Sequence, residues 1–338
     1  MAIKIQHNVS LLPYNTFGID VKAAFFTSVR TEGEMREALR SGISPVLVIG
    51  GGSNILFTRD VAGLVIKNDI SDFRIVRQFK NRAWVDAGAG VPWHDLVTRT
   101  VEANLGGLEN MSLIPGTVGA APVQNIGAYG VELKDVFVSL KAMETATGRT
   151  RTFNLKACAF GYRDSIFKRE LKGKYIILSV RVSLTTHRHN LNLSYGDIGK
   201  TLASMGVDKP GIRDISQAVC HIRRSKLPDP AEIGNCGSFF KNPETDIAVL
   251  NEIRKTHPDV PSYPLSDGRV KVPAGWLIEQ CGWKGKKVGN TGSYARQALV
   301  LVNYGGATGE EVKNLSDQII LSVQNTFGIT LEREVNII

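Results

Sequence analysis

Residues 114–130 limit, more than any other feature, what this chain can fold into. They read Ile-Pro-Gly-Thr-Val-Gly-Ala-Ala-Pro-Val-Gln-Asn-Ile-Gly-Ala-Tyr-Gly, a stretch of mainly small, polar and turn-forming character. Such a stretch lacks the side-chain volume to pack a core of its own, and its glycines and prolines favour turns. It can, however, wrap closely around a large ligand. We therefore expect this stretch to bind a ligand while other segments supply the core.

A second glycine run follows a short apolar segment. Residues 46–49 predict a buried strand, which ends at Gly-Gly-Gly-Ser-Asn, residues 50–54. Consecutive glycines let the backbone approach a ligand, and their N–H groups can surround phosphate oxygens. The run is not a Rossmann fingerprint, because Ile55 replaces the last glycine of that motif. Alone it could be a tight turn. Together with residues 87–90 and 114–130, it indicates an extended dinucleotide.

Length and composition set the class of protein. The chain has 338 residues, of which 43% are hydrophobic and 22% charged, which predicts a folded protein of two or three domains. No apolar run reaches the roughly 18 residues of a membrane span. The N-terminus carries a charge where a signal peptide would need its apolar core. A cytoplasmic location is therefore expected, without a membrane partner.

The formal net charge of +9 leaves alternatives open. Such a charge can indicate nucleic acid, an acidic membrane, anionic small molecules or simply a solvated basic surface. The basic residues are scattered, with short clusters at 223–226 and 284–287 and without a recognition motif around them. A nucleic-acid-binding protein without catalysis remains one alternative.

Cysteine and histidine spacing argues against a metal site. The four cysteines, at positions 158, 220, 236 and 281, form no Cys-x-x-Cys pair. His187 and His189 have no third ligand nearby in the sequence. We therefore expect no metal and reduced thiols, with Cys236 as a small buried hydrophobe.

Local patterns predict the main helices and strands. A capping box at Thr31 and Glu34 predicts a helix that ends at Gly42, and Thr308 with Glu311 predicts another. Residues 190–230 are interpreted as a connecting region. The other predicted elements are strands at 25–29, 84–86, 136–145, 150–154, 174–184 and 330–338, and helices starting at 91–92 and spanning 273–281.

The glycine-rich segments resemble the FAD-binding domain of the vanillyl-alcohol-oxidase type. Within that class, Phe-Gly-Tyr-Arg-Asp-Ser at 160–165, Gly-Asn-Cys-Gly-Ser-Phe-Phe-Lys-Asn-Pro at 234–243 and Leu-Glu-Arg-Glu-Val at 331–335 resemble the UDP-N-acetylenolpyruvoylglucosamine reductase family. The opening Asn-Thr-Phe-Gly at 15–18 also fits. The resemblance covers nearly the whole chain, with the motifs in the family's order.

The resemblance implies an α+β fold of three domains. Residues 1–70 and 71–227 would form the two FAD-binding subdomains, and residues 228–327 a substrate domain. The last segment, 328–338, is expected to return to the first domain. A monomer is expected. The nearest alternative is another FAD-dependent oxidase of the same fold class, acting on an alcohol or a sugar lactone.

The resemblance also implies the chemistry. Hydride would pass from NADPH, a co-substrate, to non-covalently bound FAD and then to the enolpyruvyl group of UDP-N-acetylglucosamine enolpyruvate. The product, UDP-N-acetylmuramate, is a peptidoglycan precursor. In the family, Arg163, Ser238 and Glu334 would meet in one active site, with Ser238 as proton donor. Taken alone, Arg163 could be a surface residue paired with Asp164, Ser238 a turn residue and Glu334 an exposed charge.

The remaining site residues follow from the same resemblance. The cofactor-binding residues would be Gly50, Gly51, Gly52, Ser53, Asn54, Ile114, Pro115, Gly116, Thr117, Gly119, Asn125 and Gly127. The substrate-binding residues would be Tyr129, Tyr195, Lys226, Asn242, Tyr263 and Gln297. Residues 194–197 resemble a substrate-covering loop. One departure stands out, because this chain has Tyr294 where some relatives carry histidine.

Overall fold

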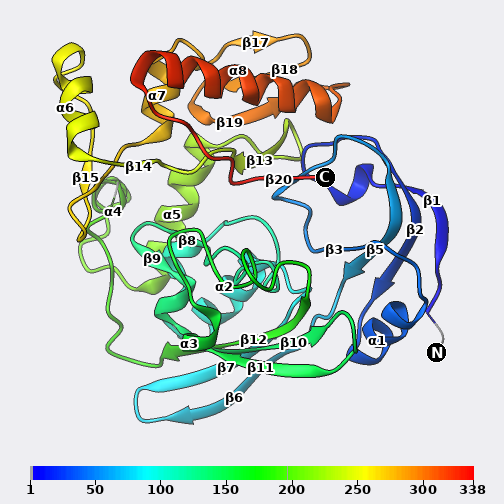
Figure 1. Cartoon of the computed structure of the whole chain (residues 1–338). Helices are drawn as coiled ribbons and strands as arrows, with labels where there is room; N and C mark the ends of the chain where they lie inside the picture. Colours follow the sequence, from blue (N-terminus) through cyan, green and yellow to red (C-terminus); the bar gives the residue numbers. More distant parts are fainter. Residues whose placement is uncertain (1–2, 196) are drawn as a thin grey trace. The chain divides into compact units, whose positions relative to one another are not determined.

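The computed structural model describes residues 3–195 and 197–338, which divide into two compact units (Figure 1). Residues 3–9, 23–52, 61–195 and 197–225 form the first unit. Residues 10–22, 53–60 and 226–338 form the second. The three-domain division remains a prediction. None of the helices among the described residues is long and apolar enough to cross a membrane.

The first unit begins with a four-stranded sheet of order β1-β2-β5-β3. Its strands are β1 (Gln6–Ser10), β2 (Lys22–Val29), β3 (Val46–Ile49) and β5 (Val61–Asn68), and β5 pairs in parallel with β2 and β3. Helix α1 (Glu32–Arg40) connects β2 to β3. Thr31 caps it by accepting a hydrogen bond from the Glu34 N–H. The Glu34 carboxylate accepts from the Arg30 N–H over 2.6 Å, so only the Thr31 half of the predicted capping box forms.

A second, antiparallel sheet of the same unit has the order β11-β10-β12-β7-β6. It comprises β6 (Phe73–Phe79), β7 (Arg82–Gly88), β10 (Phe137–Glu144), β11 (Thr150–Asn154) and β12 (Tyr175–Thr185). The unit also holds the short strands β8 (Gly127–Ala128) and β9 (Val131–Glu132), the 3-10 helices η2 (Glu109–Met111) and η3 (Leu133–Asp135), and the helices α2 (Trp93–Glu102), α3 (Leu155–Cys158), α4 (Ile198–Ser204) and α5 (Ile212–Lys226).

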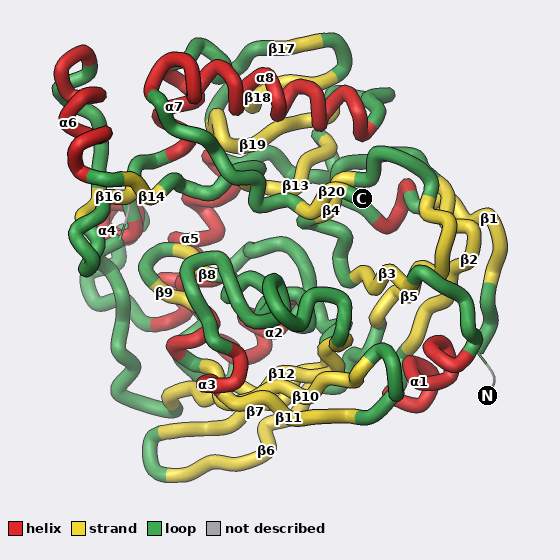
Figure 2. Tube along the Cα trace, in the orientation of Figure 1, coloured by secondary structure: helices red, strands yellow, loops and turns green. Residues whose placement is uncertain are grey.

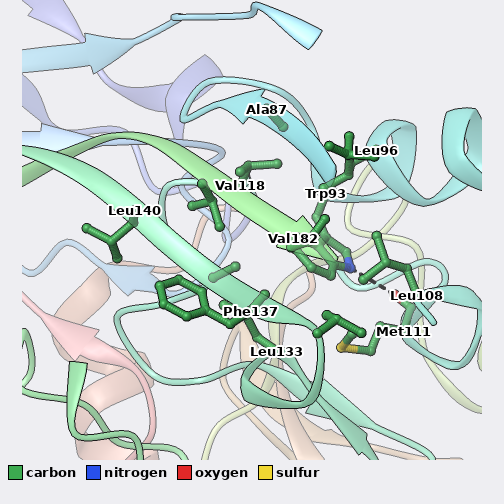
Figure 3. Close-up of a cluster of buried hydrophobic side chains, with 14 of the residues drawn as sticks. Ala87, Trp93, Leu96, Leu108, Met111, Val118, Leu133, Phe137, Leu140 and Val182 are labelled. Atoms are coloured by element: carbon green, nitrogen blue, oxygen red, sulfur yellow. Dashed lines mark hydrogen bonds between the residues drawn. The ribbon is translucent and has the colours of Figure 1, made fainter. Parts of the chain in front are cut away.

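The core beneath this sheet anchors the long glycine-rich stretch. Figure 3 shows Trp93 and Leu96 of α2 with Val182 of β12 among its buried side chains. The Trp93 indole N–H donates to the Met111 carbonyl over 3.0 Å. Val118, from the middle of the stretch, is fully buried in the same core. Ala121 is buried there too, and the partly buried Ile114, Val123 and Ile126 pack against this core, so the stretch is fastened at several side chains. Figure 2 shows the chain between α2 and β10 mainly as loop.

The second unit contains a four-stranded antiparallel sheet of order β13-β19-β18-β17. The strands are β13 (Gly234–Ser238), β17 (Lys287–Val288), β18 (Thr291–Tyr294) and β19 (Gln297–Asn303). Figure 1 shows α7 (Ala274–Gln280) and α8 (Gly309–Phe327) along this sheet. The predicted capping box of α8 is confirmed, since Thr308 and Glu311 each bind the other's backbone N–H.

The smaller elements of the second unit complete its frame. A three-stranded sheet joins β14 (Glu244–Thr245), β16 (Val270–Lys271) and β15 (Tyr263–Pro264), beside helix α6 (Ile247–Thr256). The 3-10 helix η1 (Leu12–Tyr14) lies near the start of the chain. The C-terminal strand β20 (Asn336–Ile337) pairs in parallel with β4 (Ile55–Leu56).

The α+β class and most predicted elements are confirmed. One interpretation is wrong: residues 190–230 are not only a connection, because they contain α4 and the long helix α5. The buried face of α5 repeats at helical spacing, at Ile212, Ile215 and Val219. The predicted terminal strand is also shorter than expected, because only Asn336–Ile337 find a partner strand.

Candidate active site

The glycine-rich segments of the first unit pack directly against one another. A Cβ atom on Gly50 would lie 2.2 Å from the Thr117 Oγ1, and one on Gly51 would lie 3.1 Å from the Gly116 Cα. Any larger residue would therefore force the end of β3 away from the turn at 116–117. The sequence predicted that these distant segments serve one ligand, and the fold does bring them together.

The third glycine-rich stretch joins the same assembly. The Gly119 N–H donates to the Ala89 carbonyl over 2.8 Å, and a Cβ on Gly119 would lie 2.5 Å from the Ala89 Cβ. The Trp93 N–H donates to the Gly116 carbonyl over 2.9 Å. The start of α2 therefore fixes the turn at 116–117 through the backbone.

A cavity of about 460 Å³ opens beside these turns. Its lining combines glycine backbone with two cationic side chains and one carboxylate: Arg30, Gly51, Lys67, Asp69, Ser71, Gly90, Pro92, Gly116 and Thr117. Glycine backbone and cations suit the diphosphate of a dinucleotide. The residues present therefore fit an FAD.

Asp69 enters the cavity as an anion. Burial alone would raise the pKa of its carboxyl group. Hydrogen bonds from Lys67 and Ser28 lower this pKa, and the outcome is a pKa below the ordinary value. The Lys67 ammonium lies 2.6 Å from the carboxylate. The ion pair keeps both side chains charged at neutral pH. The other cation of this cavity is Arg30, and among the described residues no carboxylate lies within ion-pair distance of its guanidinium.

The first unit has a second cavity, of about 490 Å³, which suits a dinucleotide less well. Two of its four cations pair with its own carboxylates, since Lys141 binds Glu32 over 2.5 Å and Arg181 binds Asp86 over 2.6 Å. Gly88 is the only glycine in its lining among the described residues. The first cavity is therefore the better dinucleotide site.

The predicted cofactor-binding residue Asn125 has a side chain committed to the protein. Its amide N–H groups donate to Glu132 over 3.1 Å and to the Gly161 carbonyl over 3.0 Å, and its carbonyl accepts from the Lys134 N–H. Asn125 is fully buried and has a φ of 44°. Its side chain therefore shapes the loop around it.

Arg163 is held beside this loop. Its Nη2 donates to the Gly127 carbonyl over 2.7 Å, its Nη1 lies 4.0 Å from Glu132, and its guanidinium lies over the Tyr162 ring. Its backbone φ of 51° is unusual for a residue with a Cβ. Asp164, the partner expected of a surface arginine, forms an ion pair with Arg169. The side chain is only 20% exposed, which argues against the surface alternative.

Ser238 and Glu334 are brought together in the second unit, although they are 96 positions apart in the sequence. The Glu334 N–H donates to the carbonyl of Phe239, the residue after Ser238, over 2.9 Å. The Lys241 N–H donates to the Glu332 carbonyl over the same distance. The two segments therefore run side by side, as a single site requires.

A bulge exposes the Ser238 side chain. The pairing of β13 with β19 shifts register between Asn235 and Ser238, and Gly237 between them has a φ of 72°. Bulges of this kind redirect a side chain near active sites. Ser238 is exposed whereas Phe239 is fully buried.

Cys236 is buried on the same strand. Burial raises the pKa of its thiol well above the ordinary value, and the charge of Glu334 raises it further. The thiol therefore stays protonated, which confirms the prediction of a small buried side chain. All four cysteines are free thiols, and no cluster of potential metal ligands occurs in residues 3–195 and 197–338.

The segment at 15–18 supports β13, a role that the motif alone did not reveal. The Asn235 N–H donates to the Thr16 carbonyl over 2.9 Å, and the Thr16 hydroxyl donates to the Asn235 carbonyl over 2.6 Å. A Cβ on Gly234 would lie 2.2 Å from the Phe17 carbonyl oxygen. The glycine at 234 is the one sequence signal of this close approach.

Asn54, a predicted cofactor-binding residue, adjoins Glu334. Its side-chain amide donates to the Glu334 carbonyl over 3.2 Å, and its own carbonyl accepts from the Asn336 N–H. Ser53 belongs to the same segment of the second unit. The predicted cofactor and catalytic residues of this unit are therefore neighbours.

The predicted substrate residues fall in both units. In the first, the Tyr129 and Tyr195 rings meet edge to face with centroids 6.4 Å apart, and Tyr195 is 53% exposed. Gly196, in the predicted covering loop, lies outside the described residues. The tyrosines form one aromatic pair.

In the second unit, Asn242 and Gln297 both lie at the start of α7. Oδ1 of the Asn242 side chain accepts from the Ala274 N–H over 3.0 Å, and a Cβ on Gly275 would lie 3.0 Å from the Gln297 Oε1. Tyr263 is 56% exposed on β15, and Lys226 is the last residue of α5.

Two family models match separate parts of the chain. Residues 229–338 match the family described as UDP-N-acetylenolpyruvoylglucosamine reductase, C-terminal domain, and residues 24–154 match the FAD binding domain. A UDP-N-acetylenolpyruvoylglucosamine reductase of Flavobacterium johnsoniae is 50% identical over 99% of this chain and 100% of the relative. One from Pseudomonas aeruginosa is 51% identical over the full length of both.

A solved structure has the same fold. The UDP-N-acetylenolpyruvylglucosamine reductase of Thermus caldophilus superposes with a TM-score of 0.69 over 99% of each chain, at 23% sequence identity. The full-length relatives, and not this likeness, establish the relationship. This chain belongs to the UDP-N-acetylenolpyruvoylglucosamine reductase family.

Proposed function

We propose that the protein reduces the enolpyruvyl group of UDP-N-acetylglucosamine enolpyruvate with hydride from NADPH, giving UDP-N-acetylmuramate for peptidoglycan synthesis. When bound, FAD supplies the chemistry of accepting hydride and returning it to a substrate double bond. The observation that carries the proposal is the pairing of the Ser238 segment with the Glu334 segment. The glycine-lined cavity of the first unit supports FAD as the cofactor.

Arg163 would stabilise the charge that hydride transfer creates. Hydride adds to the terminal carbon of a double bond conjugated with a carboxylate, so negative charge spreads into that carboxylate. A guanidinium can bind both carboxylate oxygens and remains charged at all working pH values. The hydrogen bond from Arg163 to the Gly127 carbonyl fixes the orientation of the guanidinium.

Ser238 would donate the proton that completes the reduction. A serine hydroxyl is a weak acid, and it can serve here because the intermediate it meets is strongly basic. Its exposure at the bulge supports this role. Glu334 would act on the carboxylate side of the substrate, where a shared proton neutralises part of the developing charge.

The remaining contacts would hold the nucleotide-sugar. Lys226 supplies positive charge for the diphosphate, and the exposed Tyr195 and Tyr263 supply stacking surfaces. Asn242 and Gln297 supply amide groups near the start of α7. The protein would act as a monomer in the cytoplasm. Light scattering during gel filtration should give the mass of one chain.

FAD should be bound without a covalent link. The sequence places no histidine or cysteine in a flavin-linkage motif, and Cys158, Cys220 and Cys236 are buried. Denaturing the purified yellow protein and filtering it should therefore leave the colour in the filtrate. Colour that stays with the denatured chain would contradict this prediction.

The positive charge should serve small anions and not nucleic acid. A protein that neutralises many phosphates binds duplex DNA with a steep salt dependence. Here we expect fluorescence anisotropy with a labelled duplex to show little binding at physiological salt. Tight, steeply salt-dependent binding would favour the nucleic-acid alternative.

A further inference from the structure

Leu113 has a strained backbone directly before the turn that contacts Gly50 and Gly51, the glycines that follow β3. Its φ is 59°, in the left-handed region that costs energy for residues with a Cβ. Residues 114–117 follow at once, and Gly116 and Thr117 of this turn lie against Gly51 and Gly50. The conformation of Leu113 therefore sets the direction in which the turn enters the cavity wall.

Two side chains hold the polar groups of Leu113. The Leu113 N–H donates to Nδ1 of His94, in the first turn of α2, over 3.0 Å. The Leu113 carbonyl accepts from Nε of Arg223, on α5, over 3.1 Å. Both polar groups of this residue are thus held by side chains of flanking helices, which offsets the cost of the left-handed conformation.

The direction of the first hydrogen bond fixes the protonation of His94. A backbone N–H can only donate, so Nδ1 must carry no proton and the ring proton lies on Nε2. Nε2 faces the Cys220 sulfur at 4.0 Å. Burial raises the pKa of that thiol, so the sulfur is neutral and can accept a weak hydrogen bond.

The charges around the ring also favour the neutral form. Burial lowers the pKa of His94 below the ordinary value, Asp95 on the same helix opposes this, and Arg224 and Arg223 of α5 reinforce it. The segment Ser112–Leu113 adds no charge. The acceptor at Nδ1 is therefore present at neutral pH.

We propose that His94 is a positioning residue for cofactor binding: its unprotonated Nδ1 holds Leu113 in the left-handed conformation and presets the turn at 114–117 for FAD. Arg223 holds the same residue from its carbonyl side. The proposal rests on the assignment of the turn at 114–117 to the cofactor. Neither side chain needs to contact FAD for this role.

Three variants of the full chain separate this role from a general packing role. His94→Leu removes the acceptor. His94→Asn keeps it, because Oδ1 of asparagine stands close to where Nδ1 of histidine stands. Cys220→Ala removes only the weak contact at Nε2. Purified holoenzyme of each is used, together with the same chain after removal of FAD.

Amide hydrogen exchange at Leu113 is the direct readout. An amide that loses its partly buried acceptor opens more easily, so His94→Leu should speed exchange by roughly 10-fold to 100-fold. The other two variants should stay within about threefold of the parent, because they keep the acceptor. Exchange that is unchanged in His94→Leu would overturn the proposal.

FAD affinity is the second readout, followed by flavin fluorescence on dilution of the holoenzyme. His94→Leu should release FAD with a dissociation constant roughly 10-fold to 100-fold higher, and His94→Asn should restore near-normal affinity. Faster exchange with unchanged affinity would overturn the link to the cofactor. Neither readout uses substrate or turnover, so neither depends on the roles proposed for Ser238 and Glu334.

The pH dependence gives a signature that packing alone would not produce. Protonation of Nδ1 removes the acceptor. Because burial holds the pKa of His94 below the ordinary value of about 6.5, FAD affinity of the parent should be intact at that pH and should fall only at more acidic pH. Stability changes with the same sign. The folded chain resists protonation of His94 while the unfolded chain accepts it, so this contribution is full above about pH 6.5 and is lost below it. His94→Asn should lack both effects. The same pH profile in parent and His94→Asn would contradict the proposal.

Discussion

Replacing Ser238 by alanine should leave flavin reduction by NADPH close to its normal rate and slow reoxidation by the enolpyruvyl substrate by roughly 100-fold to 10,000-fold. The hydroxyl is needed only after hydride has left the flavin, because only then does a basic carbon require a proton. Since Ser238 is exposed at the bulge of β13, the substitution removes little packing. Rapid-mixing absorbance measurements follow each half-reaction separately.

Cys236→Ala is the matched control for this prediction. It removes one heavy atom from the same strand, two positions away, and keeps the Ser238 hydroxyl. Reoxidation should then stay near the normal rate. If Ser238→Ala slowed both half-reactions equally, Ser238 would be a structural or flavin-binding residue. If it slowed neither, the assignment of Ser238 as proton donor would be wrong.

Replacing Arg163 by methionine should slow reoxidation by roughly 100-fold to 1,000-fold, the usual effect of removing a preorganised charge that stabilises a developing anion. Arg163→Lys should recover only part of the loss, because an ammonium cannot bind both oxygens of a carboxylate as a guanidinium does. Flavin reduction by NADPH should change little in either variant.

A matched arginine separates this effect from a loss of net charge. Arg169 lies six residues later and forms its ion pair with Asp164 on the surface of the same unit. Arg169→Met should leave both half-reactions near normal. Equal effects of the two methionine variants would mean that Arg163 acts through general electrostatics or folding. A lysine variant as fast as the parent would argue against two-oxygen binding.

Local sequence signals predicted the fold well where one segment determines its own structure. The capping boxes at Thr31 and Thr308 placed two helices correctly, because a cap needs only residues three apart. The helix α5 shows the limit of this approach. Its apolar residues recur at helical spacing, but Arg213, Asp214 and the basic cluster after it obscured the pattern.

The site was predictable as a set of segments but not as an arrangement. The glycines at 50 and 51 predicted that another group approaches their backbone closely, and the structure shows that they contact the turn at 116–117. Nothing local in the sequence could show that the Glu334 backbone forms hydrogen bonds with both Phe239 and Asn54, since these bonds join segments up to 280 positions apart. The support given to β13 by Thr16 was hidden for the same reason.

The role of the Leu113 contacts was invisible for a different reason. His94 reads in sequence as one polar residue on an amphipathic helix, and nothing marks Leu113 for a left-handed conformation. Only the backbone geometry reveals that His94 and Arg223 hold the two polar groups of one residue. Such positioning residues become apparent once hydrogen-bond partners are known.

As a member of this family, the chain should move hydride from NADPH through FAD to an enolpyruvyl nucleotide-sugar. The most direct test is one anaerobic titration of the purified yellow protein, followed by flavin absorbance. NADPH alone should bleach the flavin band, and addition of one equivalent of UDP-N-acetylglucosamine enolpyruvate should restore it, with UDP-N-acetylmuramate as the product. A band that does not bleach with NADPH, or that recovers only when oxygen is admitted, would contradict the account.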